Sequence, residues 1–156
     1  MKARFHYAAG SSGPYAAMGA LEAYLATSAI EPKLLHLVKL RASQLNACAY
    51  CIDMHWKDLR ALGESEQRLY GLDAWRESPY YSPRERAALA WTEAVTLVAT
   101  SQVPDAVYDE ARTQFDERGI GDLTMAVATI NAWNRLAIAS RSVAGLYKSQ
   151  LTPAPA

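Results

Sequence analysis

Apolar residues recur at intervals of three and four along most of the chain, which is the spacing of one face of an α-helix. No stretch alternates apolar and polar residues between hairpin turns, so we expect no β-strands. The pattern predicts an all-α fold, with helices over residues 14–27, 33–46, 47–62, 66–75, 82–100, 104–118 and 122–143.

Several helix ends carry recognisable signals. Pro32 suits a first helical turn, and Gly63 and Gly119 are plausible stops. The clearest start is Ser82-Pro83-Arg84-Glu85, with a serine cap, a proline at the first position and a glutamate three residues after the cap. These signals predict the boundaries of the helices more sharply than the periodicity does.

The length of 156 residues fits one domain with a real hydrophobic core. We expect a single domain over 1–156, with its core at about 14–147 and a frayed tail at 148–156. Lys and Arg balance Asp and Glu at 16 each, so no net charge favours nucleic acid or an anionic membrane. No export signal or membrane-spanning stretch is recognisable, and we therefore expect a cytoplasmic protein.

The predicted 122–143 helix is apolar almost all round. Between Leu123 and Tyr147 its only charged residues are Arg135 and Arg141. Such a helix is buried either in its own domain or against another subunit. We favour the second arrangement, and expect the chain to form a homo-oligomer.

The candidate chemistry lies in the segment Cys48-Ala49-Tyr50-Cys51-Ile52-Asp53-Met54-His55. On a helix, Cys48, Cys51 and His55 share one face with apolar neighbours, because steps of three and four return to the same side. The opposite side carries Asp53, Lys57, Asp58 and Arg60. The two thiols and the imidazole are therefore expected to face inward together.

This layout suits thiol redox chemistry. A thiolate is the nucleophile, a second thiol resolves the oxidised intermediate as a disulfide, and His55 can move the proton. If Asn46 caps the helix, its dipole favours Cys48 over Cys51 as the more acidic thiol. Because the cytoplasm keeps thiols reduced, we expect Cys48 and Cys51 to have a catalytic role and not to form a structural disulfide.

Three other interpretations stay open. Cys-x2-Cys-x3-His offers three zinc ligands, but a structural site needs four, and neither His6 nor His36 has ligand spacing to the motif. The cysteines and the histidine can also be ordinary core residues. Finally, the same dithiol can serve a redox-sensing or disulfide-exchange protein without catalysis.

Residues 34–56, Leu-Leu-His-Leu-Val-Lys-Leu-Arg-Ala-Ser-Gln-Leu-Asn-Ala-Cys-Ala-Tyr-Cys-Ile-Asp-Met-His-Trp, resemble the core of the AhpD-like alkylhydroperoxidases of the carboxymuconolactone decarboxylase superfamily. The run Ser43-Gln44-Leu45-Asn46 before the cysteine motif is a specific signal, and the likeness continues more loosely through 88–94 and 130–135. The resemblance implies an all-α AhpD-like helical domain, a homotrimer or homohexamer, and no metal or organic cofactor. It implies a small peroxide as substrate and a dithiol or protein reductant of unknown identity.

By the same resemblance, Cys51 is the peroxidatic thiol, Cys48 the resolving partner, and His55 a member of the proton relay. Family members often carry a glutamate twelve residues before the first cysteine, where this chain has His36. Glu93 is a candidate substitute, because it is the only charged residue in the apolar stretch 87–99. A carboxylate near His55 is expected to stabilise its imidazolium form, which in turn favours the Cys51 thiolate.

Overall fold

The structure is a computed structural model that describes residues 2–152. Within these residues every regular element is a helix and no strand occurs, so the predicted all-α class is confirmed. The elements are α1 (Tyr7–Gly10), α2 (Ser12–Ala26), α3 (Pro32–Leu45), α4 (Ala49–Ala61), α5 (Glu66–Tyr70), the 3₁₀ helix η1 (Leu72–Ala74), α6 (Pro83–Thr96), α7 (Val98–Ser101), α8 (Asp105–Gln114) and α9 (Glu117–Ser140).

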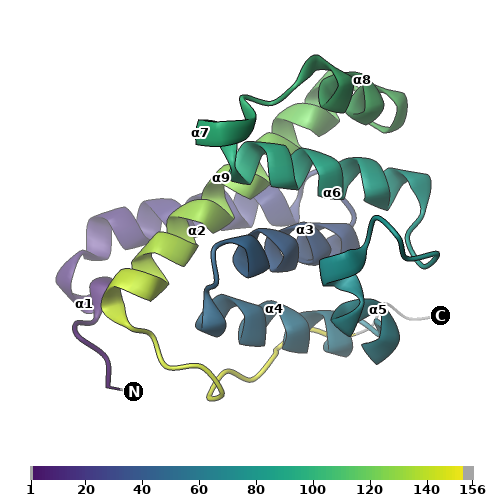
Figure 1. The fold of residues 1–156 in the computed structure, drawn as a ribbon. Helices are drawn as coiled ribbons and strands as arrows, with labels where there is room; N and C mark the ends of the chain where they lie inside the picture. Colours follow the sequence, from purple (N-terminus) through teal and green to yellow (C-terminus); the bar gives the residue numbers. More distant parts are fainter. Residues whose placement is uncertain (1, 153–156) are drawn as a thin grey trace.

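Helix α3 occupies the centre of the bundle and packs on α4, α6 and α9 (Figure 1). Its apolar residues are buried on several sides at once, with Leu37, Val38 and Leu40 at most 1% exposed. A helix surrounded in this way needs apolar groups on most of its circumference. The few polar side chains that α3 carries inward are therefore held in place by dense packing.

The start of α6 has the predicted capping box. The Ser82 hydroxyl accepts from the Glu85 N–H, and the Glu85 carboxylate accepts from the Ser82 N–H. Pro83 occupies the first turn, where its missing N–H leaves no bond unmade. The predicted helix over 82–100 is interrupted after Thr96, and α7 follows as a separate short helix.

The last long helix begins and ends earlier than predicted. Gly119 does not stop a helix, because the Asp116 side chain accepts from its N–H and starts α9 at Glu117. The preceding helix, α8, ends at Gln114 instead of Arg118. At the other end, Arg141 has a left-handed backbone (φ 56°) and terminates α9 at Ser140.

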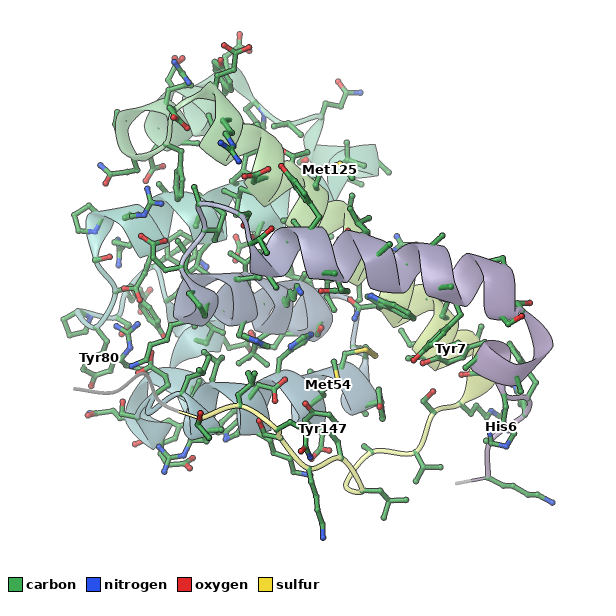
Figure 2. The ribbon with its side chains drawn as sticks, turned by 180° about the vertical axis from the view of Figure 1, so that it is seen from behind. His6, Tyr7, Met54, Tyr80, Met125 and Tyr147 are labelled. Carbon is green, nitrogen blue, oxygen red and sulfur yellow. A yellow bond between two sulfur atoms is a disulfide. The ribbon has the colours of Figure 1, made fainter. Side chains whose placement is uncertain are left out.

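Residues 141–152, here called the C-terminal segment, run without helix along α4 (Figure 2). Lys57 donates to the carbonyls of Gly145 and Tyr147, at 3.3 and 3.1 Å. The Gly145 N–H donates to Asp53 at 3.0 Å. These bonds attach the segment to the outer side of α4. Of the predicted frayed tail 148–156, residues 153–156 lie outside the described residues.

No helix among residues 2–152 has the length and apolar character needed to cross a bilayer. Apolar side chains of α9 do reach the surface, with Met125 42% and Ile138 48% exposed. Homo-oligomerisation through this helix stays a prediction.

Replacing the α6 cap provides a test of the local fold. Ser82→Ala should lower the free energy of unfolding by about 1 kcal/mol, because the Glu85 N–H loses its acceptor. Ser11→Ala is a matched control, since Ser11 precedes α2 without a side-chain capping bond, and it should change stability by no more than a few tenths of that amount. Urea denaturation of both variants measures the difference; equal losses would contradict the role assigned to the cap.

Candidate functional site

The site begins at the tight connection between α3 and α4. Ala47 takes a left-handed backbone (φ 54°), and the next residue, Cys48, is the N-cap of α4. The Cys48 sulfur accepts from the Cys51 N–H at 3.4 Å. The condition that Asn46 caps this helix is therefore not met. Asn46 ends α3, and its amide donates to Asn131 and Asn134 of α9, which fixes the connection against the core.

Cys48 and Cys51 form a disulfide across the first turn of α4, with their Cα atoms 5.4 Å apart. Both residues are almost fully buried, at 1% and 2% exposed. The spacing of the motif predicted this proximity. Because so little of either residue reaches the surface, a reactant reaches the sulfurs only from within a cavity.

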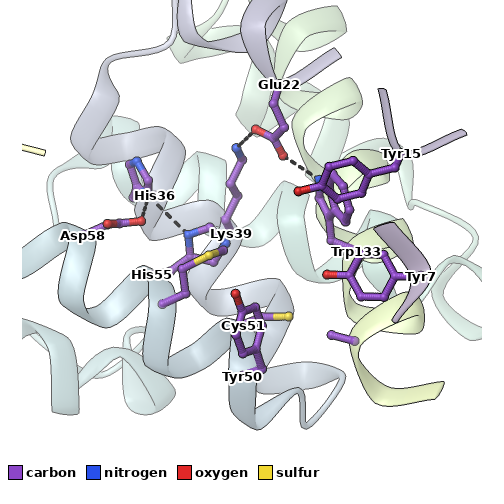
Figure 3. A pocket seen from close by; sticks show the side chains of 12 residues that line it. Tyr7, Tyr15, Glu22, His36, Lys39, Tyr50, Cys51, His55, Asp58 and Trp133 are labelled. Atoms are coloured by element: carbon purple, nitrogen blue, oxygen red, sulfur yellow. Dashed lines mark hydrogen bonds and ion pairs between the residues drawn. The ribbon is translucent and has the colours of Figure 1, made fainter. Parts of the chain in front are cut away.

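Cys51 borders a cavity of about 270 Å³ between α2, α3, α4 and α9 (Figure 3). The other residues that line it are Tyr7, Tyr15, Glu22, His36, Lys39, Tyr50, Met54, His55, Asp58, Trp133 and Ala137. Cys48 is not among the lining residues. The cavity therefore distinguishes the two cysteines: only Cys51 faces it.

The two histidines meet in the wall of this cavity. His36 of α3 and His55 of α4 place their Nδ1 atoms 3.2 Å apart, so one ring donates and the other accepts. Asp58 Oδ2 lies 3.7 Å from His36 Nδ1. Tyr147 of the C-terminal segment donates to the other oxygen, Asp58 Oδ1, at 2.8 Å. The structure thus gives His36 a place beside His55 and adds a carboxylate to the pair.

Asp58 was expected on the outer side of α4, and that expectation is wrong. The residue is only 3% exposed, because the C-terminal segment and α3 cover it. Its position three residues after His55 was the available signal, since i and i+3 are neighbours on a helix. Burial and the bond to Asp58 raise the pKa of Tyr147 to about 12, so its hydroxyl stays a donor.

Both imidazoles are held neutral. Burial lowers the pKa of His55 well below its ordinary value of 6.5, and His36 and Lys39 lower it further. Burial also lowers the pKa of His36, although Asp58 acts in the opposite direction. The expected His55 imidazolium is therefore wrong, because burial and the neighbouring His36 and Lys39 all lower its pKa. A neutral His55 acts as a proton acceptor, and its Nε2 is buried without a partner among the described residues.

The cation of the cavity is Lys39, which sequence reasoning missed. This lysine is only 4% exposed and donates to Glu22 Oε2, while the Trp133 indole N–H donates to Glu22 Oε1 at 3.0 Å. A lysine three residues after His36 on the same strongly apolar helix was the signal that pointed inward. The pair places a buried cation beside the histidines (Figure 3).

Aromatic side chains close the side of the cavity opposite the histidines (Figure 3). The rings of Tyr7, Tyr15 and Trp133 contact one another with centroids 5.6 to 6.2 Å apart. The cavity therefore combines an apolar aromatic wall with a polar wall, as many small-molecule sites do.

Glu93 does not join this cavity. Its carboxylate accepts from Arg41 and Trp75 at 2.8 Å and from Arg76 at 2.6 Å, and none of these three residues lines the site. Burial raises the pKa of Glu93, but these hydrogen bonds outweigh it and hold the pKa below its ordinary value. Glu93 is the centre of a separate structural ion cluster, and Asp58 occupies the place in the site that was sought for it.

The cluster can also hold a metal ion. Ligand atoms of His36, His55 and Asp58 all lie within 4.8 Å of one another. The sequence spacing indicated that His36 cannot share a metal ion with residues of the motif, and that inference is wrong. Packing of α3 on α4 brings His36 next to His55 of the motif. Neutral imidazoles are competent ligands. Three ligands leave at least one position open towards the cavity.

With this geometry established, comparison with known proteins places the chain. Residues 14–94 match the Carboxymuconolactone decarboxylase family, a stretch that includes the cysteine motif and both histidines of the site. The chain belongs to this family. It is an AhpD-like member of the superfamily, as the resemblance of residues 34–56 implied.

Three individual proteins illustrate the likeness. YdfG of Bacillus subtilis (strain 168), an uncharacterised protein, is 46% identical over 119 residues, 76% of this chain and 81% of that protein. An Agrobacterium tumefaciens protein of unknown function, named as a candidate antioxidant defence protein AhpD, is 42% identical with a TM-score of 0.90, over 94% of this chain and all of that one. The debrominase Bmp8, at 21% identity and a TM-score of 0.74 over 84% of this chain and 70% of its own, shares the fold.

Because the buried histidines are neutral in the folded protein, we expect the free energy of unfolding to depend on pH. Since burial holds the pKa of His55 below 6.5, the unfolded chain binds more protons once the pH drops below that value. The free energy of unfolding of the oxidised protein should therefore fall between about pH 7.5 and about pH 5.5, and His55→Gln should make this fall smaller. Urea denaturation at both pH values measures it. His6→Gln, at an exposed histidine, should keep the wild-type slope; an unchanged slope in His55→Gln would contradict the assignment.

Proposed function

We propose that the protein is a thiol-dependent peroxidase that reduces small organic peroxides through a Cys51/Cys48 dithiol–disulfide cycle. One observation carries the proposal: Cys51 alone of the two cysteines borders the cavity that holds His36, His55 and Lys39. Family membership supports a peroxidase-related function at a coarser level. The finer assignment rests on the arrangement of these groups.

In the first proposed step, the Cys51 sulfur attacks one oxygen of the peroxide bond. The thiol proton passes to His55, the O–O bond breaks, and the departing alkoxide takes that proton to leave as an alcohol. Cys51 becomes a sulfenic acid, so the sulfur is oxidised by the two electrons that reduce the peroxide. His55 suits this transfer because burial keeps its imidazole neutral and able to accept a proton.

In the second proposed step, the Cys48 thiol attacks the Cys51 sulfenic sulfur. The sulfenic oxygen leaves with the thiol proton as water, and the disulfide forms. The Cα separation of 5.4 Å across the first turn of α4 is within the usual range for a disulfide. The disulfide of the present structure corresponds to the end of the oxidative half of the cycle.

Lys39 has the third role in the proposal. Negative charge develops on the Cys51 sulfur and then on the departing oxygen, and a buried cation in the same cavity stabilises both. Glu22 and the Trp133 indole hold Lys39 and its counter-charge in position. In this arrangement Lys39 has the role that was expected of a histidine cation.

The cavity also defines the size of the substrate. A volume of about 270 Å³, walled on one side by Tyr7, Tyr15 and Trp133, accommodates a peroxide with a small apolar group. Such a group displaces water from the aromatic wall, whereas hydrogen peroxide leaves that wall without a contact. An organic hydroperoxide is therefore the preferred substrate in this proposal.

The roles of the two thiols can be separated by single substitutions. Cys51→Ser should abolish the reaction with cumene hydroperoxide, while Cys48→Ser should still react and accumulate a sulfenic acid at Cys51. Stopped-flow peroxide consumption together with a dimedone-type probe and mass spectrometry measures both. A probe adduct on Cys48 in the Cys51→Ser protein would reverse the assignment.

The proton relay can be tested at the reduced enzyme. His55→Ala should slow peroxide reduction about a hundredfold or more, because acid–base help is lost, and Asp58→Asn should change the pH dependence of the same rate. Glu93→Gln is the control, since its ion cluster lies apart from the cavity, and the folded variant should keep the wild-type profile. The measurement is the pH dependence of Cys51 alkylation and of single-turnover peroxide reduction.

If Glu93→Gln alters the pH profile and His55→Ala does not, the relay proposed here is wrong. Two further outcomes would favour the other functions that the motif permits. If peroxide forms the Cys48–Cys51 disulfide but no dithiol supports repeated turnover of peroxide, the result would indicate a redox sensor. Stoichiometric zinc in protein purified under reducing conditions, lost in Asp58→Asn, would instead favour the metal site formed by His36, His55 and Asp58.

A further inference from the structure

A second cavity lies beside the other sulfur. It has a volume of about 360 Å³, and Cys48 lines it whereas Cys51 does not. Tyr50 and Ala137 line both this cavity and the peroxide cavity, so these two side chains stand between them. The remaining lining residues are Arg4, Ala47, Ala49, Ile138, Arg141 and Ser142. The proposed peroxide reaction makes no use of this space.

We propose that this second cavity is the entry site of the reductant, an anionic thiol that attacks the Cys48 sulfur of the disulfide. The inference rests on the proposed function only in treating the disulfide as the product of peroxide reduction. Reduction of the disulfide itself can be measured with no peroxide present. Three observations support it: which sulfur faces the cavity, which thiol leaves, and the charge around the opening.

The direction of attack follows from the chemistry of disulfide exchange. A thiolate displaces one sulfur by approaching the other along the line of the S–S bond. Attack on Cys48 therefore requires open space on the Cys48 side of the bond, away from Cys51. The second cavity is the one that Cys48 borders, whereas of the two cysteines only Cys51 borders the peroxide cavity.

The choice of leaving group supports the same direction. Disulfide exchange is faster when the departing sulfur is the more stable thiolate. Cys51 departs into a cavity that contains the Lys39 side chain, the Glu22 and Asp58 carboxylates and the His36–His55 pair. The arginines that line the cavity beside Cys48 are exposed, so Lys39 is the buried cation next to the disulfide. Attack at Cys48 releases Cys51 beside this buried cation and returns it to its reactive form.

The opening of the second cavity carries positive charge. Arg4 and Arg141 line it, both are exposed, and no carboxylate lines it. Within residues 2–152, neither arginine has a carboxylate within ion-pair distance. The backbone fixes their positions: the Arg4 N–H donates to Ser140 at 2.8 Å, and Arg141 ends α9 in a left-handed conformation (φ 56°). Two unpaired cations beside an apolar floor of alanines and Ile138 favour a reductant with a negative charge and an apolar chain.

The two exchange steps balance as follows. The reductant thiolate forms a bond to the Cys48 sulfur, the Cys48–Cys51 bond breaks, and Cys51 leaves as a thiolate. A second thiolate, from the same dithiol or from another molecule, then attacks the mixed disulfide and releases Cys48. Cys48 takes a proton from solvent, and the reductant leaves as a disulfide, so two electrons pass from the reductant to the protein.

The test compares three small thiols of different charge on the oxidised wild-type protein. The probes are 3-mercaptopropionate, 2-mercaptoethanol and cysteamine, with each rate corrected for the thiolate fraction and intrinsic nucleophilicity of the thiol. We expect the anion to react fastest and the cation slowest, because each arginine contributes about a threefold Coulomb effect in water. With two arginines, each unit of charge on the probe should change the rate about tenfold at low salt. The difference should shrink as salt is added.

Charge-reversal variants make the test specific. The double variant Arg4→Glu and Arg141→Glu should reverse the order of the three thiols. Arg135→Glu is the matched control, since this exposed arginine of α9 does not line the cavity, and it should keep the wild-type order. Equal rates for the three thiols in the wild type, or the same order in the double variant, would overturn the proposal.

The site of attack is read separately. Acid quenching during reduction by a single monothiol should trap the mixed disulfide on Cys48, as peptide mass spectrometry would show. A mixed disulfide on Cys51 would overturn the proposal even if the charge preference holds. A protein that forms the Cys48 adduct with the expected charge order, yet fails to reduce any peroxide, would support this inference and refute the peroxidase function.

Discussion

The contact between His36 and His55 is the interaction on which the site depends. It joins the central helix α3 to α4 at a distance of 3.2 Å between the two Nδ1 atoms, at the same place where Cys51 faces the cavity. Two facing imidazole nitrogens at this distance share one proton between them, so at least one of the two rings must be uncharged. Burial supplies that condition by lowering the pKa of each histidine. The packing of α3 in the core therefore determines the protonation of the site.

Much of the fold and the centre of the site could be predicted from the sequence. Helical periodicity, the Ser82 capping box and the inward position of Cys48, Cys51 and His55 are local properties, and all appear in the structure, although Cys48 borders a different cavity. The prediction failed where two local signals compete. Gly119 predicts the end of a helix, but the Asp116 side chain accepts a hydrogen bond from its N–H and starts a helix there. Such a choice depends on which hydrogen bond the folded chain can complete.

The second layer of the site could not be read in this way. Lys39 and Asp58 reach the cavity because helices distant in sequence cover them, and their burial is a consequence of packing. Glu93, as an isolated carboxylate in an apolar stretch, does need polar partners. It found those partners in Arg41 and Arg76. Sequence spacing shows that a charge must be satisfied, but only tertiary structure shows which group satisfies it.

The substitution of His36 for the glutamate that the family often carries has an electrostatic consequence. A glutamate beside His55 would bring a second negative charge close to Asp58 and would oppose a thiolate on Cys51. The neutral ring of His36 instead passes a proton without changing the charge of the cavity, and it leaves Lys39 as the cation nearest the histidines. In the proposed cycle the Cys51 thiolate occurs twice, as the attacking group towards peroxide and as the leaving group during reduction. The same cation stabilises it both times, so one arrangement of charge serves both halves of the cycle, while the two cavities keep the peroxide and the reductant on different sulfurs.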